Sequence, residues 1–192
     1  RKQLAKPAPA PSPQPEQPKG TDAAQSKGAD TAQPQVSALK VPNNLDPSRW
    51  QCDAAAQQCS VRMLIIGDSV TAGVAQTLQQ HFPQAHIDGA VSRQFATGED
   101  LLAQFLGSGE DPQVIVFALG TNGAATREQA EHVVQLAAGR PLYFVTALAP
   151  LDWTAASNAT FQEVAAAHPN VGIIDSSALA PAHPEYLYDD GT

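Results

Sequence analysis

Ser69 stands in the tripeptide Gly67-Asp68-Ser69, directly after the apolar run 64–66 and directly before a helix-like stretch. A serine in this position has two chemical uses. Its hydroxyl, or the carboxylate of Asp68, can cap the N-terminus of the helix, as these residue types commonly do. Alternatively, Ser69 is a nucleophile, which needs a base, an orienting carboxylate and donors for an oxyanion. The tripeptide alone leaves both interpretations open.

A second candidate group lies farther along the chain, in Gly120-Thr121-Asn122-Gly123, again after an apolar run. The Asn122 amide is a suitable donor to a developing oxyanion, and the flanking glycines let the backbone approach a ligand closely. The alternative is an ordinary Gly/Asn turn. A serine loop and an asparagine loop at one edge of the same sheet favour the catalytic interpretation.

Short apolar runs alternate with longer amphipathic runs from residue 61 onward, which predicts parallel βαβ units with right-handed crossovers. Runs that are apolar along their whole length, such as 114–119, are typical of a sheet covered on both faces. We therefore predict an α/β fold, a flavodoxin-like three-layer α/β/α sandwich with a central parallel five-stranded sheet. The predicted strands are 62–66, 86–90, 113–119, 142–146 and 172–175, and the predicted helices are 71–82, 98–107, 126–138 and 154–167.

In an open parallel sheet, ligands bind beyond the carboxyl ends of the strands. Two residues at this predicted edge have an open role in substrate binding. Trp153 is placed to stack on a sugar ring, or it serves as a lid or core residue. Arg93 binds a carboxylate-bearing substrate, or it forms an ion pair with Glu99 or Asp100, which is the favoured interpretation in so acidic a domain.

The first fifty residues differ in composition from the rest of the 192-residue chain, because they hold nine of its sixteen prolines. Residues 1–40 almost lack aromatic and branched apolar side chains, so they cannot bury enough surface to offset the entropy of ordering. We therefore predict a disordered or semi-extended linker over 1–49 and a folded domain over 50–192.

Charge is divided in the same way. Residues 1–50 carry a net charge of +3 and residues 51–192 carry −11. So acidic a domain is not expected to bind nucleic acid, because neutralising phosphates requires clusters of Lys and Arg. No apolar stretch of about 18 residues is present, so no transmembrane helix is predicted within the chain.

The only two cysteines, Cys52 and Cys59, lie just before the first predicted strand. In an oxidising compartment they are expected to form a disulfide that closes a small loop, and in a reducing one they are two free thiols. The chain has no second cysteine pair and no histidine near these two, so a zinc site is not predicted.

Four short blocks together resemble those of the SGNH (GDSL-type) hydrolases: residues 67–70, 92–94, 120–123 and 190–192. In particular, the chain resembles the extracytoplasmic SGNH domains of membrane-bound acyltransferase-3-type O-acetyltransferases, which modify bacterial peptidoglycan and other polysaccharides. The resemblance covers about residues 61–192.

The resemblance implies a role for each block. Ser69 is the nucleophile, and its backbone N–H and the Asn122 side chain form part of the oxyanion hole. The second block normally supplies a glycine whose N–H completes the hole, and Ser92 stands in that position here. Asp190 matches the aspartate of the family's final Asp-x-x-His.

The histidine of that final block would follow Thr192, the last residue of the chain. We therefore expect the chain to be truncated and inactive as written, because Ser69 then has no base to take its proton. The histidine nearest to Asp190 in the sequence is His183, which lies between an alanine and a proline.

The resemblance also implies the function: O-acyl transfer, most simply of acetyl, through an acyl-serine intermediate to a cell-wall or surface polysaccharide. The partners are then an acyl donor, a polysaccharide acceptor and an upstream multi-pass membrane domain, and the location is extracytoplasmic, in the periplasm or at the cell surface. Serine chemistry needs no metal or organic cofactor. A secreted SGNH carboxylesterase or lipase and a non-catalytic carbohydrate-binding domain are the alternatives.

Overall fold

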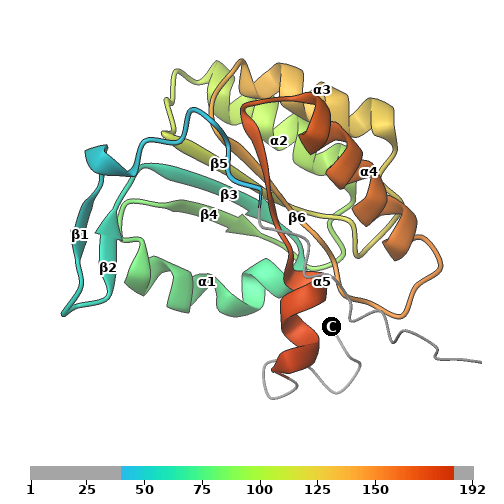
Figure 1. Ribbon diagram of the computed structural model, residues 1–192, viewed down its shortest axis with the longest axis horizontal. Helices are drawn as coiled ribbons and strands as arrows, with labels where there is room; N and C mark the ends of the chain where they lie inside the picture. Colours follow the sequence, from blue (N-terminus) through green and yellow to red (C-terminus); the bar gives the residue numbers. More distant parts are fainter. Residues whose placement is uncertain (1–39, 184–192) are drawn as a thin grey trace, which may run out of the picture. The chain divides into compact units, whose positions relative to one another are not determined.

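A parallel sheet of five strands forms the centre of the computed structural model, which describes residues 40–183 (Figure 1). Its strands, in spatial order, are β4 (His86–Gly89), β3 (Met63–Gly67), β5 (Val114–Ala118), β6 (Leu142–Val145) and β7 (Val171–Ile174). The chain starts in the interior of the sheet at β3, moves out to β4, and then returns across β5 to β7. All four pairings are parallel, so every strand ends at the same edge of the sheet.

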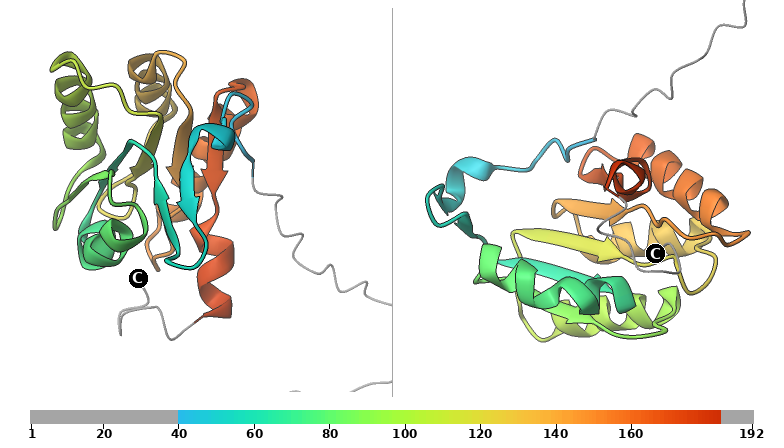
Figure 2. Two further views of the ribbon diagram at one scale, coloured as in Figure 1. Left: turned by 90° about the vertical axis from the view of Figure 1, so that its left-hand side faces the viewer. Right: turned by 90° about the horizontal axis from the view of Figure 1, so that it is seen from below.

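Helices cover both faces of this sheet (Figure 2). On one face lie α2 (Phe95–Gly107), α3 (Arg127–Ala137) and α4 (Thr154–Ala167), and on the other lies α1 (Ser69–His81). Side chains of a strand alternate between the two faces. Accordingly, Leu64 and Ile66 join the core under α2, α3 and α4, whereas Ile65 joins the core beside α1. The predicted three-layer fold is confirmed.

Four phenylalanines fix the helices of the larger core to the sheet. Phe117 and Phe144 lie on neighbouring strands, are fully buried, and contact each other edge to face. Phe161 of α4 stacks on Phe144 with ring centroids 4.9 Å apart, and Phe95 of α2 packs against Phe117 at 5.0 Å. Since aromatic side chains bury the largest apolar areas, these contacts hold α2 and α4 firmly, and with them the loops that precede both helices.

The predicted strands agree with the observed ones to within one residue at each end. The largest difference in a helix is the start of α2, which begins at Phe95 rather than at residue 98. Phe95 is 4% exposed, and its burial brings the first turn of the helix onto the sheet. Composition did not predict the short elements η1 (Pro47–Arg49), β1 (Gln51–Asp53), β2 (Gln58–Ser60), α5 (Ser176–Leu179) and η2 (Ala180–Ala182).

Strands β1 and β2 form an antiparallel hairpin in which Cys52 pairs directly with Cys59, and a disulfide joins the two residues. The hairpin contacts the C-terminal end of α1, where Nδ1 of His81 lies 2.7 Å from the carbonyl oxygen of Gln57. The disulfide therefore closes the segment that leads into the first strand of the sheet.

Residues 40–49 pack on the domain, although the predicted linker includes them. The N–H of Ile173 donates to the carbonyl of Lys40 at 2.8 Å, and the N–H of Asn43 donates to the carbonyl of Pro169 at 2.7 Å. The segment thus lies along the exposed side of β7. Backbone hydrogen bonds to an edge strand need no apolar side chains, which is why composition did not reveal this packing. Within residues 40–183, no helix has the length and hydropathy needed to cross a bilayer.

Candidate active site

The register of the sheet brings three of the predicted blocks to one place. Gly67, the last residue of β3, pairs with Gly89 of β4 on one side and with Ala118 of β5 on the other. The loops that carry Ser69, Ser92 and Asn122 therefore leave three adjacent strands at the same edge. This is the edge at which open parallel sheets bind ligands.

Asp68, and not Ser69, caps α1. The Asp68 carboxylate is buried and accepts the N–H of Val70 at 3.0 Å, whereas Ser69 is the first residue of the helix. Within the part of the chain that the structure describes, neither the hydroxyl nor the N–H of Ser69 has a hydrogen-bond partner. Ser69 is half-buried at a helix N-terminus, where the backbone favours a negative charge.

Two glycines let the first turn of α1 approach the strand ends. A Cβ atom on Gly67 would lie 1.9 Å from the hydroxyl oxygen of Thr71, and one on Gly89 would lie 2.4 Å from the N atom of Ala72. Neither position has room for a side chain. The close contact fixes the height of Ser69 above the sheet.

Ser92 adopts the left-handed backbone conformation, with φ of +59°. This conformation suits glycine, which is the residue that the resemblance leads one to expect at this position. Ser92 is exposed, and its N–H has no acceptor among residues 40–183. The chain therefore keeps the backbone geometry of a glycine here while carrying a side chain.

Arg93 lies beneath this loop and does not pair with Glu99 or Asp100, so that prediction is wrong. Its guanidinium donates to the carboxylate of Asp88 at 2.6 Å and to the carbonyl of Gly67 at 2.9 Å. The side chain is only 8% exposed. The loop turns Arg93 back toward the ends of β3 and β4, where it braces the site. The Arg93 guanidinium, which was predicted to bind substrate, is therefore already paired with the Asp88 carboxylate.

Asn122 presents an amide without a partner. Its Nδ2 atom is buried, and it makes no hydrogen bond within the described part of the chain. The loop around it depends on Gly120 and Gly123, which have φ values of +137° and +156°. A Cβ atom on Gly123 would lie 2.7 Å from Oε1 of Gln94, so the second and third blocks touch.

Trp153 supports the asparagine loop from the next strand. Its indole Nε1–H donates to the carbonyl of Gly120 at 3.2 Å, and the side chain is half-buried. The same residue is therefore placed between β5 and β6 at the candidate site. Its predicted stacking on a sugar ring stays a prediction.

A polar cluster at the ends of β6 and β7 was not found from the sequence. Asp175 accepts hydrogen bonds from the hydroxyls of Thr146 and Ser177, at 2.9 and 2.7 Å, and from the N–H of Ala178 at 3.1 Å. Burial raises the pKa of the Asp175 carboxyl, but these hydrogen bonds outweigh it and leave the pKa below its ordinary value. The cluster fixes α5 to the sheet, and the Asp-Ser-Ser sequence after a strand is the signal by which it could have been found.

Four of the five histidines lie away from the serine edge. His81 ends α1, and His86 begins β4, so both lie toward the amino ends of the strands. Nδ1 of His132 lies 2.8 Å from the carboxylate of Glu99, and His168 pairs with a glutamate on α3. His183 follows η2. Asp190 and Thr192 lie outside the described residues.

The comparisons with known proteins agree with the fold, although no family model matches the chain. YrhL of Bacillus subtilis strain 168, named as a candidate peptidoglycan O-acetyltransferase, is 34% identical over 129 residues, which are 67% of this chain and 20% of YrhL. The C-terminal catalytic domain of peptidoglycan O-acetyltransferase A (OatA) of Streptococcus pneumoniae, solved with a methylsulfonyl adduct, has the same fold. Its TM-score is 0.58 at 24% identity, over 66% of this chain and 75% of that one.

A member of the G-D-S-L lipolytic family from Veillonella parvula also shares the fold, with a TM-score of 0.54 at 12% identity, over 68% of this chain and 87% of that one. These two likenesses show that the chain has the fold of these solved structures. In sequence, it is similar to curated O-acetyltransferases over two thirds of its own length. The matched region spans about a fifth of the length of the curated relatives.

Proposed function

We propose that this domain transfers an acyl group, most simply acetyl, to a hydroxyl of a cell-wall polysaccharide through an acyl-serine intermediate. The observation that carries this proposal is a set of unused donors at one edge of the sheet. The N–H groups of Ser69 and Ser92 and the Asn122 amide make no hydrogen bond within residues 40–183. An oxyanion requires free donors of this kind, and these three groups lie on loops that leave adjacent strands at the same edge.

The reaction has two balanced steps. In the first, Ser69 Oγ loses its proton to a base and attacks the acyl carbonyl carbon, and the carbonyl oxygen becomes the oxyanion. The bond from the acyl carbon to the leaving group then breaks, and the leaving group takes the proton. In the second step, a sugar hydroxyl attacks the acyl-serine, and Ser69 recovers a proton as the sugar ester forms.

The base belongs to the same proposal. The resemblance assigns this role to a histidine three residues after Asp190, with Asp190 orienting its imidazole. His183 is the competing candidate, because it is the histidine that follows the carboxyl end of β7 through α5 and η2. The two candidate bases differ in the turnover expected of one variant, His183→Gln.

The proposal extends to the setting of the domain. We propose that it works outside the cytoplasm, tethered to a membrane domain in a longer polypeptide. The curated relatives are much longer than the matched region, which supports a further domain. The Cys52–Cys59 disulfide supports an oxidising compartment.

The test compares turnover of p-nitrophenyl acetate by four proteins. These are the 192-residue chain, the polypeptide continued to the natural end of its parent, and that longer polypeptide carrying Ser69→Ala or His183→Gln. We expect turnover by the longer protein and its His183→Gln variant, and none above background from Ser69→Ala. Equal turnover by the Ser69→Ala variant would contradict the proposal.

Adding a polysaccharide acceptor separates transfer from hydrolysis. An acyltransferase makes acetylated glycan at the expense of free acetate, whereas a secreted esterase makes free acetate at an unchanged rate. A protein that binds glycan but shows no Ser69-dependent turnover is the non-catalytic binding domain.

A further inference from the structure

A second feature of the carboxyl edge lies where β6 passes into α4. A pocket of about 350 Å³ opens there, lined by the loop 147–152, by the first turn of α4 and by Ser177. We call it the α4 pocket. Its volume is in the range of small-ligand sites. It lies next to the loop of Asn122, because Trp153, which precedes α4, holds the carbonyl of Gly120.

The first turn of α4 brings unused donors to this pocket. The N-cap residue, Trp153, makes no side-chain capping bond, and the N–H groups of Ala155 and Ala156 find no acceptor within residues 40–183. An uncapped helix N-terminus attracts an oxygen acceptor. Thr154 and Ala155 both line the pocket, so the helix end faces it.

Thr154 gives an independent sign of a ligand. The residue is 6% exposed, and its hydroxyl oxygen has no hydrogen-bond partner within the described chain. A buried hydroxyl without a partner costs about 1–3 kcal/mol, so native proteins rarely leave one without a reason. A ligand oxygen seated at the first turn of α4 would supply the missing partner.

The walls of the pocket restrict the chemistry of the ligand. Among residues 40–183, no Lys, Arg or His lines it, and Asp152 does, so its carboxylate would repel a phosphate or carboxylate. Leu148 and Leu151 offer apolar contact. The Asn158 amide is not available to a ligand, because it accepts the N–H of Ala147 and donates to the carbonyl of Ala147, each at 2.9 Å.

We infer that the α4 pocket binds the acetamido group of an N-acetylated sugar in the acceptor glycan. The acetamido carbonyl accepts hydrogen bonds from the first turn of α4, its N–H donates toward Asp152, and its methyl group contacts the leucines. This inference rests on the proposed function, since it assigns the acceptor a binding subsite at the edge of the sheet that carries Ser69.

The experiment measures binding without chemistry. The Ser69→Ala protein, labelled with ¹⁵N, is titrated with tetra-N-acetylchitotetraose and, separately, with cellotetraose, a neutral oligosaccharide of equal length without acetamido groups. We expect the acetylated sugar to shift the amide signals of Ala155 and Ala156 and to bind at least about tenfold more tightly than cellotetraose. Equal binding of both sugars, shifts confined to another surface, or no binding would overturn the inference.

Two matched pairs of variants locate the effect. Ala155→Leu fills the pocket and is expected to weaken binding about tenfold or more, whereas Ala156→Leu, one residue along the same turn, is not. Thr154→Val removes the unpartnered hydroxyl and is expected to weaken binding severalfold without loss of thermal stability. Thr160→Val makes the same change farther along α4 and is expected to leave binding unchanged.

These results separate the inference from the proposed function. Acetylated-sugar binding at α4 without Ser69-dependent turnover would contradict the acyl transfer and leave the pocket in place. Ser69-dependent turnover with unchanged binding in Ala155→Leu would contradict the pocket and leave the acyl transfer in place.

Discussion

The two edges of the central sheet differ in whether their polar groups have hydrogen-bond partners. At the amino edge the groups are paired: Asn170 donates to the carbonyl of Arg140 at 3.1 Å, Asn44 donates to the carbonyl of Gly139 at 2.7 Å, and His168 lies 2.7 Å from the carboxylate of Glu131. Beyond the carboxyl ends of β3 and β5, the Ser69 hydroxyl and the Asn122 amide have no partner within residues 40–183.

The difference indicates that the residues at the carboxyl edge serve a purpose besides the stability of the fold. Unpaired buried groups lower stability, and in the described part of the chain they lie at the carboxyl edge, which points to a ligand there. Ser92 adds backbone strain at the same edge, with its φ of +59°.

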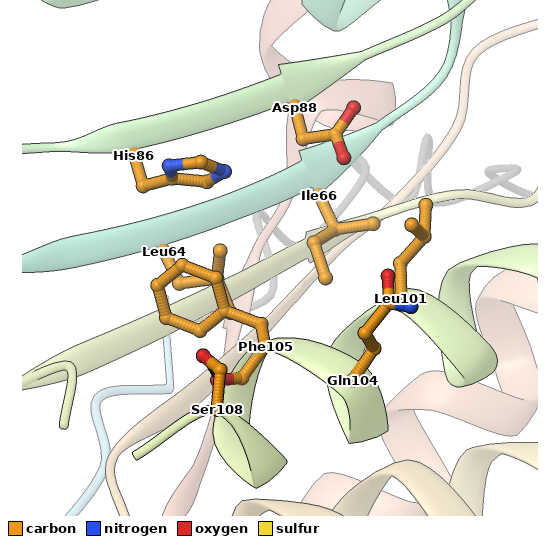
Figure 3. Close-up of a pocket in the computed structure, with 8 residues that line it drawn as sticks. All are labelled: Leu64, Ile66, His86, Asp88, Leu101, Gln104, Phe105 and Ser108. Carbon is orange, nitrogen blue, oxygen red and sulfur yellow. Dashed lines mark hydrogen bonds between the residues drawn. The ribbon is translucent and has the colours of Figure 1, made fainter. Parts of the chain in front are cut away.

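A cavity elsewhere in the fold supports this interpretation. This cavity has a volume of about 230 Å³. It lies between β4 and the C-terminal half of α2 (Figure 3). Its walls contain the His86 and Phe105 rings, whose centroids are 4.9 Å apart, and apolar side chains such as Leu101. None of the buried groups without a partner that the structure describes lies in this cavity. Within residues 40–183, the buried side-chain groups without a partner, on Asn122 and Thr154, both lie toward the carboxyl edge.

The largest expected effect separates two asparagines. Asn122→Ala should lower kcat for p-nitrophenyl acetate about 10²–10³-fold, because it removes an oxyanion donor, and should leave thermal stability unchanged. Asn170→Ala should leave kcat unchanged and lower the free energy of unfolding by about 1 kcal/mol, because it removes the hydrogen bond to the carbonyl of Arg140. Steady-state kinetics and urea unfolding measure both quantities for each variant, and similar effects of the two substitutions would contradict a difference between the edges.

Arginines make the next contrast. Arg93→Met should lower the free energy of unfolding by about 2 kcal/mol, because it leaves Asp88 and the Gly67 carbonyl beneath the site without their donor. Arg140→Met should cost less than about 1 kcal/mol, since its partner Asp111 is 73% exposed. Urea unfolding of both proteins measures the difference, and equal losses would show that Arg93 does not brace the site.

Acid should weaken the anchor of α5 through Asp175. Because the folded pKa of this carboxyl is lowered, its contribution to stability is fully present above the unfolded pKa and is lost as the pH falls through the folded pKa. Asp175→Asn should therefore lower stability at pH 7 by about 1–2 kcal/mol and flatten the loss of stability below about pH 4. Thermal unfolding from pH 3 to 7 tests this, and parallel profiles for the two proteins would refute it.

The smallest effect concerns backbone strain. Ser92→Gly should raise the free energy of unfolding by up to about 1 kcal/mol, because glycine adopts a positive φ without strain, and should keep the rate. Ser92→Val should lower it by a similar amount, since a β-branched residue fits this conformation poorly. A loss of stability in Ser92→Gly would argue against strain at this position.

The sequence predicted the strands well because fully apolar runs between glycines and prolines have few other uses. It also predicted which loops meet, because parallel strands end at one edge. It could not predict the partner of Arg93, since Asp88 is brought near by the turn of the loop, nor the hydrogen bonds that tie residues 40–43 to β7. The unused Thr154 hydroxyl was equally hidden, because the absence of a partner is a property of packing alone.

Covalent trapping of Ser69 tests the central claim most directly. The polypeptide continued to the natural end of its parent would be treated with methanesulfonyl fluoride, digested, and mapped by mass spectrometry beside its Ser69→Ala variant. The account predicts one methylsulfonyl group, on the peptide that contains Ser69, with loss of p-nitrophenyl acetate turnover in proportion to labelling. Full turnover after labelling, or labelling confined to other peptides, would contradict it.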